Sequence, residues 1–455
     1  MASTSVAWTP SSSGNRNKWT WSGWVKRSSL GEQVIFGCYQ NGSYMTELKF
    51  STSDQIHFED TYNTNTNGRI ITTANFKDTN AWYHIVAVFD NAAGSGASDK
   101  IKVYVNGVNQ AGAYGNAPTN ATTLNSSGQK IQHGQLGAGT NFDGLMSHCH
   151  FCDGYAYAAS DFGETDSTTG EWKIKTSPSV SYGTNGFWIL KDGNSVTDES
   201  PNSNNFTVET GTLTKSEDNP SNVFDTINTN FAKTGGVNGR DSNIRIFIDN
   251  GATRLSTDVA LWTTMLGSIP MFSGKYYWEC KRTFEGSPSN HLARVGVEPL
   301  DTAGTTLGSP VGTNTNSVNY QSEGGGLKSN SSYSGTYASW QSNNDIVQIA
   351  VDMDNYFIYF GKNGTWQNSG DPTSGSSGTG GIALMAGKGY VNGFTVHRGG
   401  GSAGGDKSML KMNFGNGYFQ QTAVASAGTN ASGLGIFEYD VPTGYTALCT
   451  KGLNE

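Results

Sequence analysis

Trp82-Tyr-His-Ile-Val-Ala-Val-Phe89 and Lys100-Ile-Lys-Val-Tyr-Val105 are the two segments that decide the fold. In an extended chain, successive side chains point to opposite faces, so residues 82–89 place their odd-numbered members on one face and their even-numbered members on the other. The second segment runs directly into Asn106-Gly107, the dipeptide best suited to a two-residue hairpin turn. Together these residues predict an antiparallel pair of strands.

Similar strand patterns recur along the whole chain, separated by turns rich in Gly, Asn, Ser and Thr. Further examples are Trp19–Arg27, Gly274–Lys281, Ala293–Glu298, Ile346–Asp352, Tyr356–Phe360 and Met409–Phe414. Asn363-Gly364 is a second hairpin signal. Strands at this spacing predict an all-β fold of two tandem antiparallel β-sandwich (jelly-roll) domains.

Helical signals are scarce. In the segment 257–266, Val259, Trp262 and Leu266 have helical spacing, which predicts one short helix. Ala158–Phe162 is expected to form a single helical turn. Apolar density is low in 216–240, so we expect domains over residues 1–215 and 241–455 with a linker over 216–240.

Composition and charge exclude several classes of protein. The 455 residues include 60 Gly, 11 Trp, 20 Tyr and 21 Phe, and only 15% are charged. So many aromatic residues are not expected in a disordered chain, and the low charge argues against a coiled coil. The net charge is −8 and no Lys/Arg run is present, so we expect no binding to nucleic acid and no insertion into a membrane.

The cysteines and the N-terminal residues favour synthesis in a reducing cytoplasm. Cys38, Cys149, Cys152, Cys280 and Cys449 are odd in number and lie in strand-like contexts, which predicts free buried thiols. Residues 1–8 lack a basic region followed by an apolar one, so no secretory signal is expected.

An ordered set of motifs in the first half resembles a known family. The set is Gly14–Arg27, Trp82–Asp90, Ile101–Gly107, Phe142-Asp-Gly144, Phe151-Cys-Asp-Gly154, Ser160–Glu164 and Tyr182–Phe187. It is similar to the laminin-G-like, concanavalin A-type jelly-roll modules of phage structural proteins, over roughly residues 1–215.

The second half resembles a SPRY module, another β-sandwich. The motifs are Gly274-Lys-Tyr-Tyr-Trp-Glu279, Arg294-Val-Gly-Val297, Asp345–Asp354, Phe357–Gly364 and Asn413-Phe-Gly415. The pairing of the two modules resembles bacteriophage tail-fibre or other virion-surface proteins, and Pro442–Cys449 resembles the ending of such proteins.

His148-Cys149-His150-Phe151-Cys152 is the sharpest local cluster of metal-ligand residue types. On a straight strand, His148, His150 and Cys152 share one face, and such ligands suit zinc or copper. Ligands two residues apart on a strand are about 6.6 Å apart, which is long for a compact tetrahedral site. We therefore favour ordinary strand packing and expect no metal.

Catalytic signals are weak. Asp352 and Asp354 alternate on one strand, but they lead into a hairpin and match a structural SPRY position. No Gly-x-Ser-x-Gly elbow and no phosphate-binding glycine loop is present. We therefore expect no enzymatic activity. The laminin-G resemblance implies calcium as one alternative at the loop of Asp90, Asn91 and Asp99, although a solvated acidic loop is favoured.

Aromatic residues within polar loops are the best candidates for a ligand surface. Rigid rings beside adaptable polar groups suit both sugars and protein partners. The candidate ligand-binding residues are Tyr62, Tyr320, Tyr333, Tyr337 and Trp340. The alternative is that Tyr337 and Trp340 belong to the core.

These interpretations lead to an expected function. The resemblance implies a virion structural protein, made in the host cytoplasm and exposed on a phage particle as a tail fibre or related appendage. We expect it to adhere to a host-surface glycan or protein, to contact other virion proteins and to form a homo-oligomer. Three alternatives remain open: a purely architectural capsid fibre or tail adaptor, a carbohydrate-active enzyme, and a secreted cellular adhesin.

Overall fold

The computed structural model describes residues 4–137, 139–168, 170–191, 195–234, 246–249, 252–258, 260–286, 291–303, 310–329, 332–399, 406–420 and 422–454. The chain divides into two compact units, one of residues 1–215 with 219–221 and the other of 216–218 with 222–455. Each unit is built from two antiparallel sheets with helical segments of three to six residues, so the predicted all-β fold of tandem β-sandwiches is confirmed. In the described part of the chain, no helix is long and apolar enough to span a membrane.

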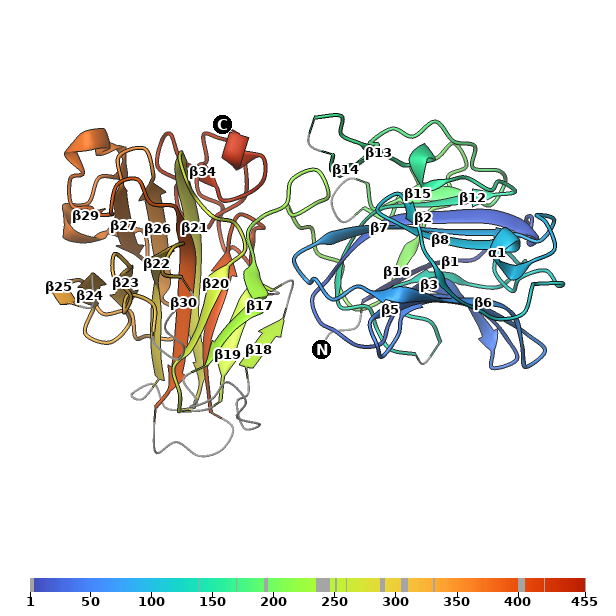
Figure 1. The fold of residues 1–455 in the computed structure, drawn as a ribbon, viewed down its shortest axis with the longest axis horizontal. Coiled ribbons are helices and arrows are strands. Elements are labelled where there is room, and N and C mark those ends of the chain that lie inside the picture. Colours follow the sequence, from blue (N-terminus) through green and yellow to red (C-terminus); the bar gives the residue numbers. More distant parts are fainter. Residues whose placement is uncertain are drawn as a thin grey trace. The chain divides into compact units, whose positions relative to one another are not determined.

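The first sandwich contains an eight-stranded and a six-stranded sheet, drawn in Figure 1 as two stacked layers. The first sheet has the order β10 (Gly112–Tyr114), β6 (Asn65–Asn75), β5 (Gln55–Tyr62), β4 (Tyr44–Phe50), β3 (Gln33–Asn41), β11 (Ile131–His133), β1 (Ser5–Trp8), β16 (Thr207–Thr210). The second has the order β15 (Phe187–Ile189), β12 (Gly144–Asp153), β2 (Lys18–Arg27), β7 (Trp82–Asp90), β8 (Ile101–Val105), β9 (Val108–Asn109). The short segments α1 (Ala97–Lys100) and η1 (Ala159–Asp161) lie between strands, and η1 confirms the predicted single turn.

Strand β7 buries both of its faces, and its odd-numbered and even-numbered residues lie on opposite faces as predicted. Its odd-numbered residues join the core between the sheets, where Trp19 stacks on Phe89 at 5.7 Å between ring centroids. Its even-numbered Val86 and Val88 face a third layer with Trp188. The hairpin of β13 (Gly163–Thr165) and β14 (Trp172–Ile174) carries Trp172 into that layer.

Both predicted Asn-Gly turns have the left-handed backbone that such turns require. Asn106 and Gly107 have φ of 46° and 82°, and Asn363 and Gly364 have 47° and 87°. At Gly107 an added Cβ would also lie 2.5 Å from the Trp172 ring. Only glycine fits this position, because both the conformation and the space exclude a side chain.

Gly107→Ala is therefore expected to lower the free energy of unfolding of the first sandwich by about 2–4 kcal/mol, measured by denaturant titration. The matched control is Gly128→Ala, because Gly128 has φ of 71° and open space around its Cβ position. At Gly128 an alanine side chain meets no neighbouring atom but has the same left-handed backbone strain. This control should therefore lower the free energy of unfolding by only about 1–2 kcal/mol. Equal effects in the two variants would contradict the role given to Trp172.

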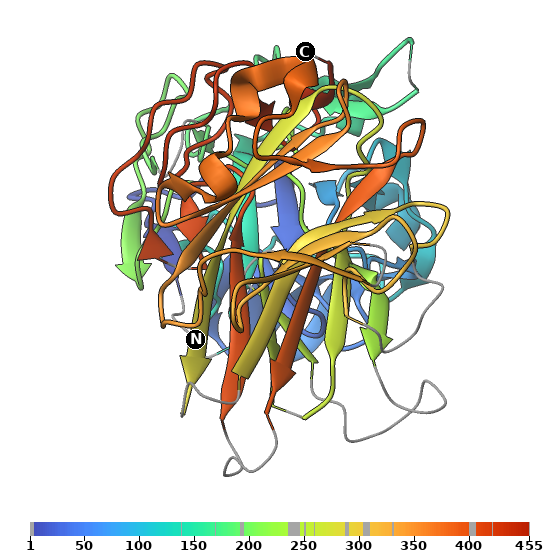
Figure 2. The same cartoon turned by 90° about the vertical axis from the view of Figure 1, so that its left-hand side faces the viewer.

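The second sandwich contains a seven-stranded and a nine-stranded sheet, whose long strands lie side by side in Figure 2. The first has the order β17 (Ile227–Thr234), β20 (Thr263–Gly267), β30 (Tyr390–Arg398), β22 (His291–Pro299), β23 (Val318–Gln321), β24 (Gly326–Ser329), β25 (Ser332–Thr336). The second has the order β18 (Ile246–Asp249), β19 (Arg254–Thr257), β31 (Lys407–Asn413), β21 (Lys275–Glu285), β26 (Ile346–Asp352), β27 (Phe357–Lys362), β28 (Thr365–Trp366), with β29 (Ile382–Ala383) beside β27 and β34 (Thr446–Ala447) beside β21. The remaining segments are β32 (Tyr418–Phe419), β33 (Thr422–Ala423), η3 (Gln367–Ser369), η4 (Pro372–Ser377) and η5 (Gly452–Asn454).

Two sequence expectations need correction in this unit. Strand β17 lies inside the predicted linker 216–240 and pairs with β20, so the stretch between the sandwiches is shorter than predicted. The helix predicted over 257–266 is wrong, because Thr263–Gly267 is strand β20, hydrogen-bonded to β30. Pairing with neighbouring strands overrides the weak helical spacing of Trp262 and Leu266.

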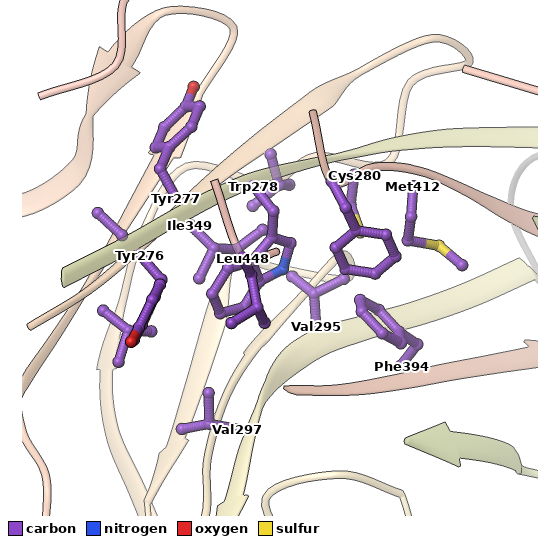
Figure 3. Close-up of a cluster of buried hydrophobic side chains, with 14 of the residues drawn as sticks. Tyr276, Tyr277, Trp278, Cys280, Val295, Val297, Ile349, Phe394, Met412 and Leu448 are labelled. Atoms are coloured by element: carbon purple, nitrogen blue, oxygen red, sulfur yellow. The ribbon is translucent and has the colours of Figure 1, made fainter. Parts of the chain in front are cut away.

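Strand β21 organises the core of the second sandwich. Trp278 and Cys280 lie among Val295, Phe394 and Met412, whereas Tyr277 points to the opposite side of the strand (Figure 3). Tyr277 is also buried, since it packs edge-on against Phe437 with 4.9 Å between ring centroids. The C-terminal segment therefore covers the outer side of β21.

As predicted, the five cysteines are buried and none of them forms a disulfide.

Candidate functional site: a pocket and an apolar platform in the second sandwich

The predicted ligand-binding aromatic residues lie in very different environments. Trp340 and Tyr320 are fully buried, with 5.8 Å between their ring centroids, and Tyr320 donates its hydroxyl hydrogen to the Ala338 carbonyl. The structure thus corrects the prediction for these two residues, which form core and offer no ring to a ligand. Tyr337 is half-buried against the same cluster, and the Tyr333 side chain lies outside the described residues.

Among the predicted ligand-binding residues whose side chains the structure describes, Tyr62 has an accessible ring. It is 37% exposed at the end of β5 and packs edge-on against Tyr44 with 5.4 Å between centroids. Asn63 and Thr64, which follow it, form a tight turn with left-handed φ of 49° and 67°. Tyr62 therefore stays a candidate contact on the rim of the first sandwich.

The His148–Cys152 cluster does not lie on a straight strand. Its pairing with β2 shifts register between Ser147 and His150, and His148 has a left-handed φ of 48°. His150 stacks on Trp188 at 4.9 Å and its Nδ1 lies 2.9 Å from the Tyr182 hydroxyl. Burial lowers the pKa of His150 well below its ordinary value and raises that of the Cys152 thiol, so both are neutral packing residues.

The side chains of Asp90, Asn91 and Asp99, in the acidic loop after β7, have partners within the protein. Asp90 forms an ion pair with Lys18 at 2.9 Å, and the Asn91 amide oxygen accepts from Lys100 Nζ at 3.1 Å. Asp99 Oδ2 accepts from the Gly96 amide at 2.9 Å. Each of these three side chains thus has a partner within the protein, and calcium binding stays an alternative to the favoured acidic loop.

Among the described residues, one further group could hold a metal ion. Glu47, His57 and Glu59 bring ligand atoms within 4.8 Å of one another on the outer face of β4 and β5. His57 Nε2 contacts Glu59 at 2.9 Å, and Lys49 Nζ contacts Glu47 at 2.9 Å. The ligand atoms thus contact one another and Lys49, and we interpret the group as a polar network on this face of the sheet.

Several buried carboxylates act as anchors for loops. Asp198 accepts hydrogen bonds from the amides of Trp188, Ser200 and Asn204 at 2.7–2.8 Å. Glu279 accepts from the Glu438 and Tyr439 amides and from the Tyr277 hydroxyl at 2.8–2.9 Å. Burial raises the pKa of Glu279 to about 7 despite these hydrogen bonds.

An exposed apolar platform lies just before β21. Phe272 is 64% exposed, and its ring and the Leu300 side chain both cover Gly389, where an added Cβ would lie 2.5 Å and 2.9 Å from them. Met385, on the neighbouring loop, is also exposed, and its amide donates to the Tyr390 hydroxyl at 2.9 Å. We call Phe272, Leu300 and Met385 the apolar platform.

Charged groups border this platform. Lys388 forms an ion pair with Asp301, which directly follows Leu300, and both side chains are partly exposed. Sequence reasoning missed the platform because its members come from separate polar loops. Phe272, alone between Met271 and Ser273-Gly274, was the one signal available.

A pocket of about 320 Å³ opens two residues further along the chain. Its walls come from the start of β21, the turn after β26, and the C-terminal segment with β34, which lies beside β21 (Figure 1). The lining residues are Gly274, Lys275, Asp354, Ala431, Ser432, Gly444, Tyr445, Thr446 and Gly452. Lys275 Nζ lies 2.9 Å from the buried Asp352 and 5.8 Å from the centre of the Tyr445 ring.

Comparisons with known proteins are consistent with this architecture. Residues 2–160, less than half of the chain, match the family described as the concanavalin A-like lectin/glucanases superfamily, Laminin_G_3. No curated protein matches the sequence.

Solved structures similar to this chain include a SPRY domain, laminin domains and a pentraxin. The SPRY domain of human HERC1 is 16% identical, covers 41% of this chain and 96% of that domain, and has a TM-score of 0.29. Domains LG4-5 of the mouse laminin alpha1 chain are 8% identical over 90% of this chain and 86% of theirs, with a TM-score of 0.29. A heptameric SAP-like pentraxin from Limulus polyphemus is 16% identical over 34% and 72%, with a TM-score of 0.27.

At these identities and TM-scores, nothing about ligands follows from the solved structures. The first unit contains a concanavalin A-like jelly-roll domain of the laminin G type, and the chain has SPRY domains among its structural neighbours.

Proposed function

We propose that this chain is a structural protein of a bacteriophage particle, exposed as a tail fibre or related appendage, that adheres to a glycan or protein on the host surface. The virion part of the proposal rests on the ordered sequence resemblances in both halves. The adhesive part rests on one observation, the apolar platform of Phe272, Leu300 and Met385 beside an open pocket.

The platform has the chemistry of a recognition surface. A ring fixed over a glycine backbone presents a flat apolar face at little cost in side-chain entropy. The ion pair of Lys388 and Asp301 supplies polar groups at its edge. Sugars and protein segments both combine apolar faces with hydrogen-bonding groups, so either class of ligand fits.

The arrangement favours binding over bond cleavage. Glycoside hydrolysis uses two carboxyl groups about 5–10 Å apart across a cleft. The pocket instead has Lys275 and Asp354 as its charged lining residues, a cation and an anion. The buried Asp198 and Glu279 are occupied as acceptors for backbone amides. A carbohydrate-active enzyme is therefore the weaker candidate.

Weak sites become effective when many copies bind together. Linked modules convert each further binding event into an intramolecular one, which raises avidity by about 10²–10⁴. A homo-oligomeric fibre with other virion proteins at its base would supply such copies.

Phe272→Ala is expected to reduce adhesion about tenfold or more when the chain is displayed in many copies on beads and incubated with host bacterial cells. The reason is that an exposed aromatic anchor contributes about 1–2 kcal/mol per site. Leu30→Ala is the matched control, because Leu30 is also an exposed apolar residue, 50% accessible, but lies in the first sandwich.

Two outcomes decide between adhesion and the alternatives. If the displayed wild-type chain does not bind host cells although mass spectrometry finds the chain in purified particles, the architectural role replaces adhesion. If the chain releases oligosaccharides from host polysaccharide, it is an enzyme.

A further inference from the structure

We propose that Asn41 is a site of spontaneous deamidation, where the side-chain amide loses ammonia and becomes aspartate or isoaspartate. Asn41 ends β3 and is followed by Gly42 in the tight turn that leads into β4. The reaction needs no partner molecule, because its reactants are the chain itself and water. The proposal is independent of the proposed function and describes a change in the chain over time.

The reaction joins the asparagine side chain to the backbone that follows it. The Gly42 nitrogen attacks Cγ of Asn41, its proton passes through water to Nδ2, and the Cγ–Nδ2 bond breaks as ammonia leaves. The product is a succinimide ring, which water opens at either of its carbonyl groups. One opening gives aspartate, and the other gives isoaspartate, in which the main chain runs through Cβ. A glycine after the asparagine favours the attack, because no side chain shields its nitrogen.

Several Asn-Gly pairs of the described residues are protected by burial or by hydrogen bonds. Asn67, Asn185 and Asn392 are only 6%, 4% and 0% exposed, so water has little access to them. In the Asn416 pair, the glycine amide donates to Asn413 Oδ1 at 3.1 Å. That glycine nitrogen is therefore engaged, and its attack on Cγ would break the hydrogen bond.

The two predicted hairpin turns are exposed, but their side chains are bonded to neighbouring strands. Asn106 Oδ1 accepts from the His84 amide of β7 at 2.8 Å, which turns the side chain away from the following glycine. Asn363 Oδ1 accepts from the first amide of β26 at 2.8 Å, and the Gly364 amide donates to Gln348 Oε1 at 2.8 Å. Succinimide formation at either turn would first have to break these hydrogen bonds.

Asn41 has the opposite arrangement. It is exposed, and its Oδ1 accepts from the Ser43 amide at 2.9 Å. This Asx turn folds the side chain back over its own backbone and holds Cγ beside the Gly42 nitrogen, which lies between the two bonded residues. The Gly42 amide has no acceptor among the described residues, and no atom beyond its chain neighbours lies within 4 Å of its Cβ position. The attacking nitrogen is therefore free and open to the water that carries its proton.

The Ser43 amide also stabilises the charge that the reaction creates. When the nitrogen attacks Cγ, negative charge develops on Oδ1, and an N–H group already placed at this oxygen lowers the energy of that state. In the turns at Asn106 and Asn363, the donor comes from another strand and holds the side chain against it. In the Asn41 turn the donor belongs to the same turn, so no contact between strands is lost when the ring closes.

Deamidation would change the rim of the first sandwich. It adds a negative charge, and isoaspartate also adds a carbon atom to the main chain, at the position opposite Tyr44. Tyr44 packs against Tyr62 with 5.4 Å between ring centroids. The rim that carries the candidate contact Tyr62 would therefore differ between freshly made and aged chains.

The test follows deamidation of the full chain by mass spectrometry. Purified protein is incubated in mildly alkaline buffer at physiological temperature and digested with trypsin, which releases the peptide Ser28–Lys49 with Asn41 as its one asparagine. We expect Asn41 to convert at least about tenfold faster than Asn106 and Asn363 in the folded chain, because those two must break hydrogen bonds first. In urea, where no turn persists, the three sites should convert at similar rates.

Three variants test the assigned atoms. Gly42→Ala places a methyl group beside the attacking nitrogen and should slow conversion of Asn41 about tenfold. Gly42 has no left-handed φ and has open space at its Cβ position, so this variant should fold like the wild type. Asn41→Gln keeps an amide but would need a larger ring, so ammonia loss at this position should stop. The matched control is Ser43→Ala, which keeps the backbone amide that donates to Oδ1 and should leave the rate unchanged.

The proposal is wrong if folded Asn41 stays unmodified while it converts in urea, or if the three sites convert equally fast in the folded chain. It is also wrong if Gly42→Ala leaves the rate unchanged, because the Gly42 nitrogen would then not be the attacking atom. Adhesion that depends on Phe272 is measured separately, so none of these results affects the proposed function.

Discussion

Trp340→Ala will lower the free energy of unfolding of the second sandwich by about 3–5 kcal/mol. Trp340 is fully buried and lies beside Tyr320, so its removal leaves a large cavity between the sheets. The loss is measured by urea titration followed by tryptophan fluorescence, with each sandwich treated as its own transition.

Two further variants separate the core role of Trp340 from a ligand-binding role. Trp340→Phe should lower the free energy of unfolding less than Trp340→Ala does, because phenylalanine fills most of the space. The indole nitrogen of Trp340 also has no hydrogen-bond partner to lose. Tyr62→Ala, at an exposed rim position, should cost less than about 1 kcal/mol. If Trp340→Ala left the unfolding curve unchanged, its placement in the core would be wrong.

Lowering the pH from 7 to 5 will destabilise the first sandwich by about 4 kcal/mol through two histidines alone. Complete burial lowers the pKa of His84 and of His133 to about 3 in the folded state. In the unfolded chain each has its ordinary value near 6.5, so between pH 6.5 and 3 the unfolded state binds more protons. The contribution of the two neutral histidines to the free energy of unfolding is therefore fully present above pH 6.5. It is lost as the pH falls from 6.5 towards 3.

The surroundings of His84 explain why it stays neutral. Its Nδ1 accepts from the Trp172 indole at 3.0 Å, its Nε2 lies 2.9 Å from the Ser22 hydroxyl, and its ring stacks on Trp24 at 4.8 Å. Protonating Nδ1 would replace an acceptor by a donor and break the bond to Trp172.

His84→Gln provides the test of this acid sensitivity. Glutamine can accept from Trp172 and donate to Ser22 without titrating in this range. We expect a variant that is less stable at pH 7 but loses less stability between pH 7 and 5, by about 2 kcal/mol, in acid titrations followed by circular dichroism. An unchanged pH dependence would show that His84 does not contribute.

Much of the fold could be predicted from local sequence. Alternation in Trp82–Phe89 identified a strand with two apolar faces, and the Asn-Gly dipeptides at 106 and 363 identified hairpins, because each signal depends on the preferences of adjacent residues. The helix prediction for Thr257–Leu266 failed because the segment forms cross-strand hydrogen bonds to β30, more than a hundred residues away. These bonds outweigh its weak helical spacing.

The candidate site was much less accessible to sequence reasoning. Tyr320 stands in polar surroundings in the sequence, but it is part of β23, which buries it beneath Trp340. The His148 bulge depends on register against β2, which no local pattern reveals. The pocket joins Lys275, Asp354 and Thr446 from three distant segments, so only the tertiary structure could assemble it.

The parallel pairing of β34 with β21 has a consequence for synthesis. Thr446 and Ala447 lie opposite Tyr276 and Tyr277. The backbone of Cys449 pairs with that of Phe224, near the beginning of the second unit, in an isolated antiparallel β-bridge. A nascent chain released from the ribosome short of residue 446 would leave the centre of this unit uncovered and its pocket without a wall. Such a fragment would expose apolar surface to proteases, whereas a chain that contains β34 would bury it. Proteases of the cell would therefore degrade the fragments faster than the longer chains.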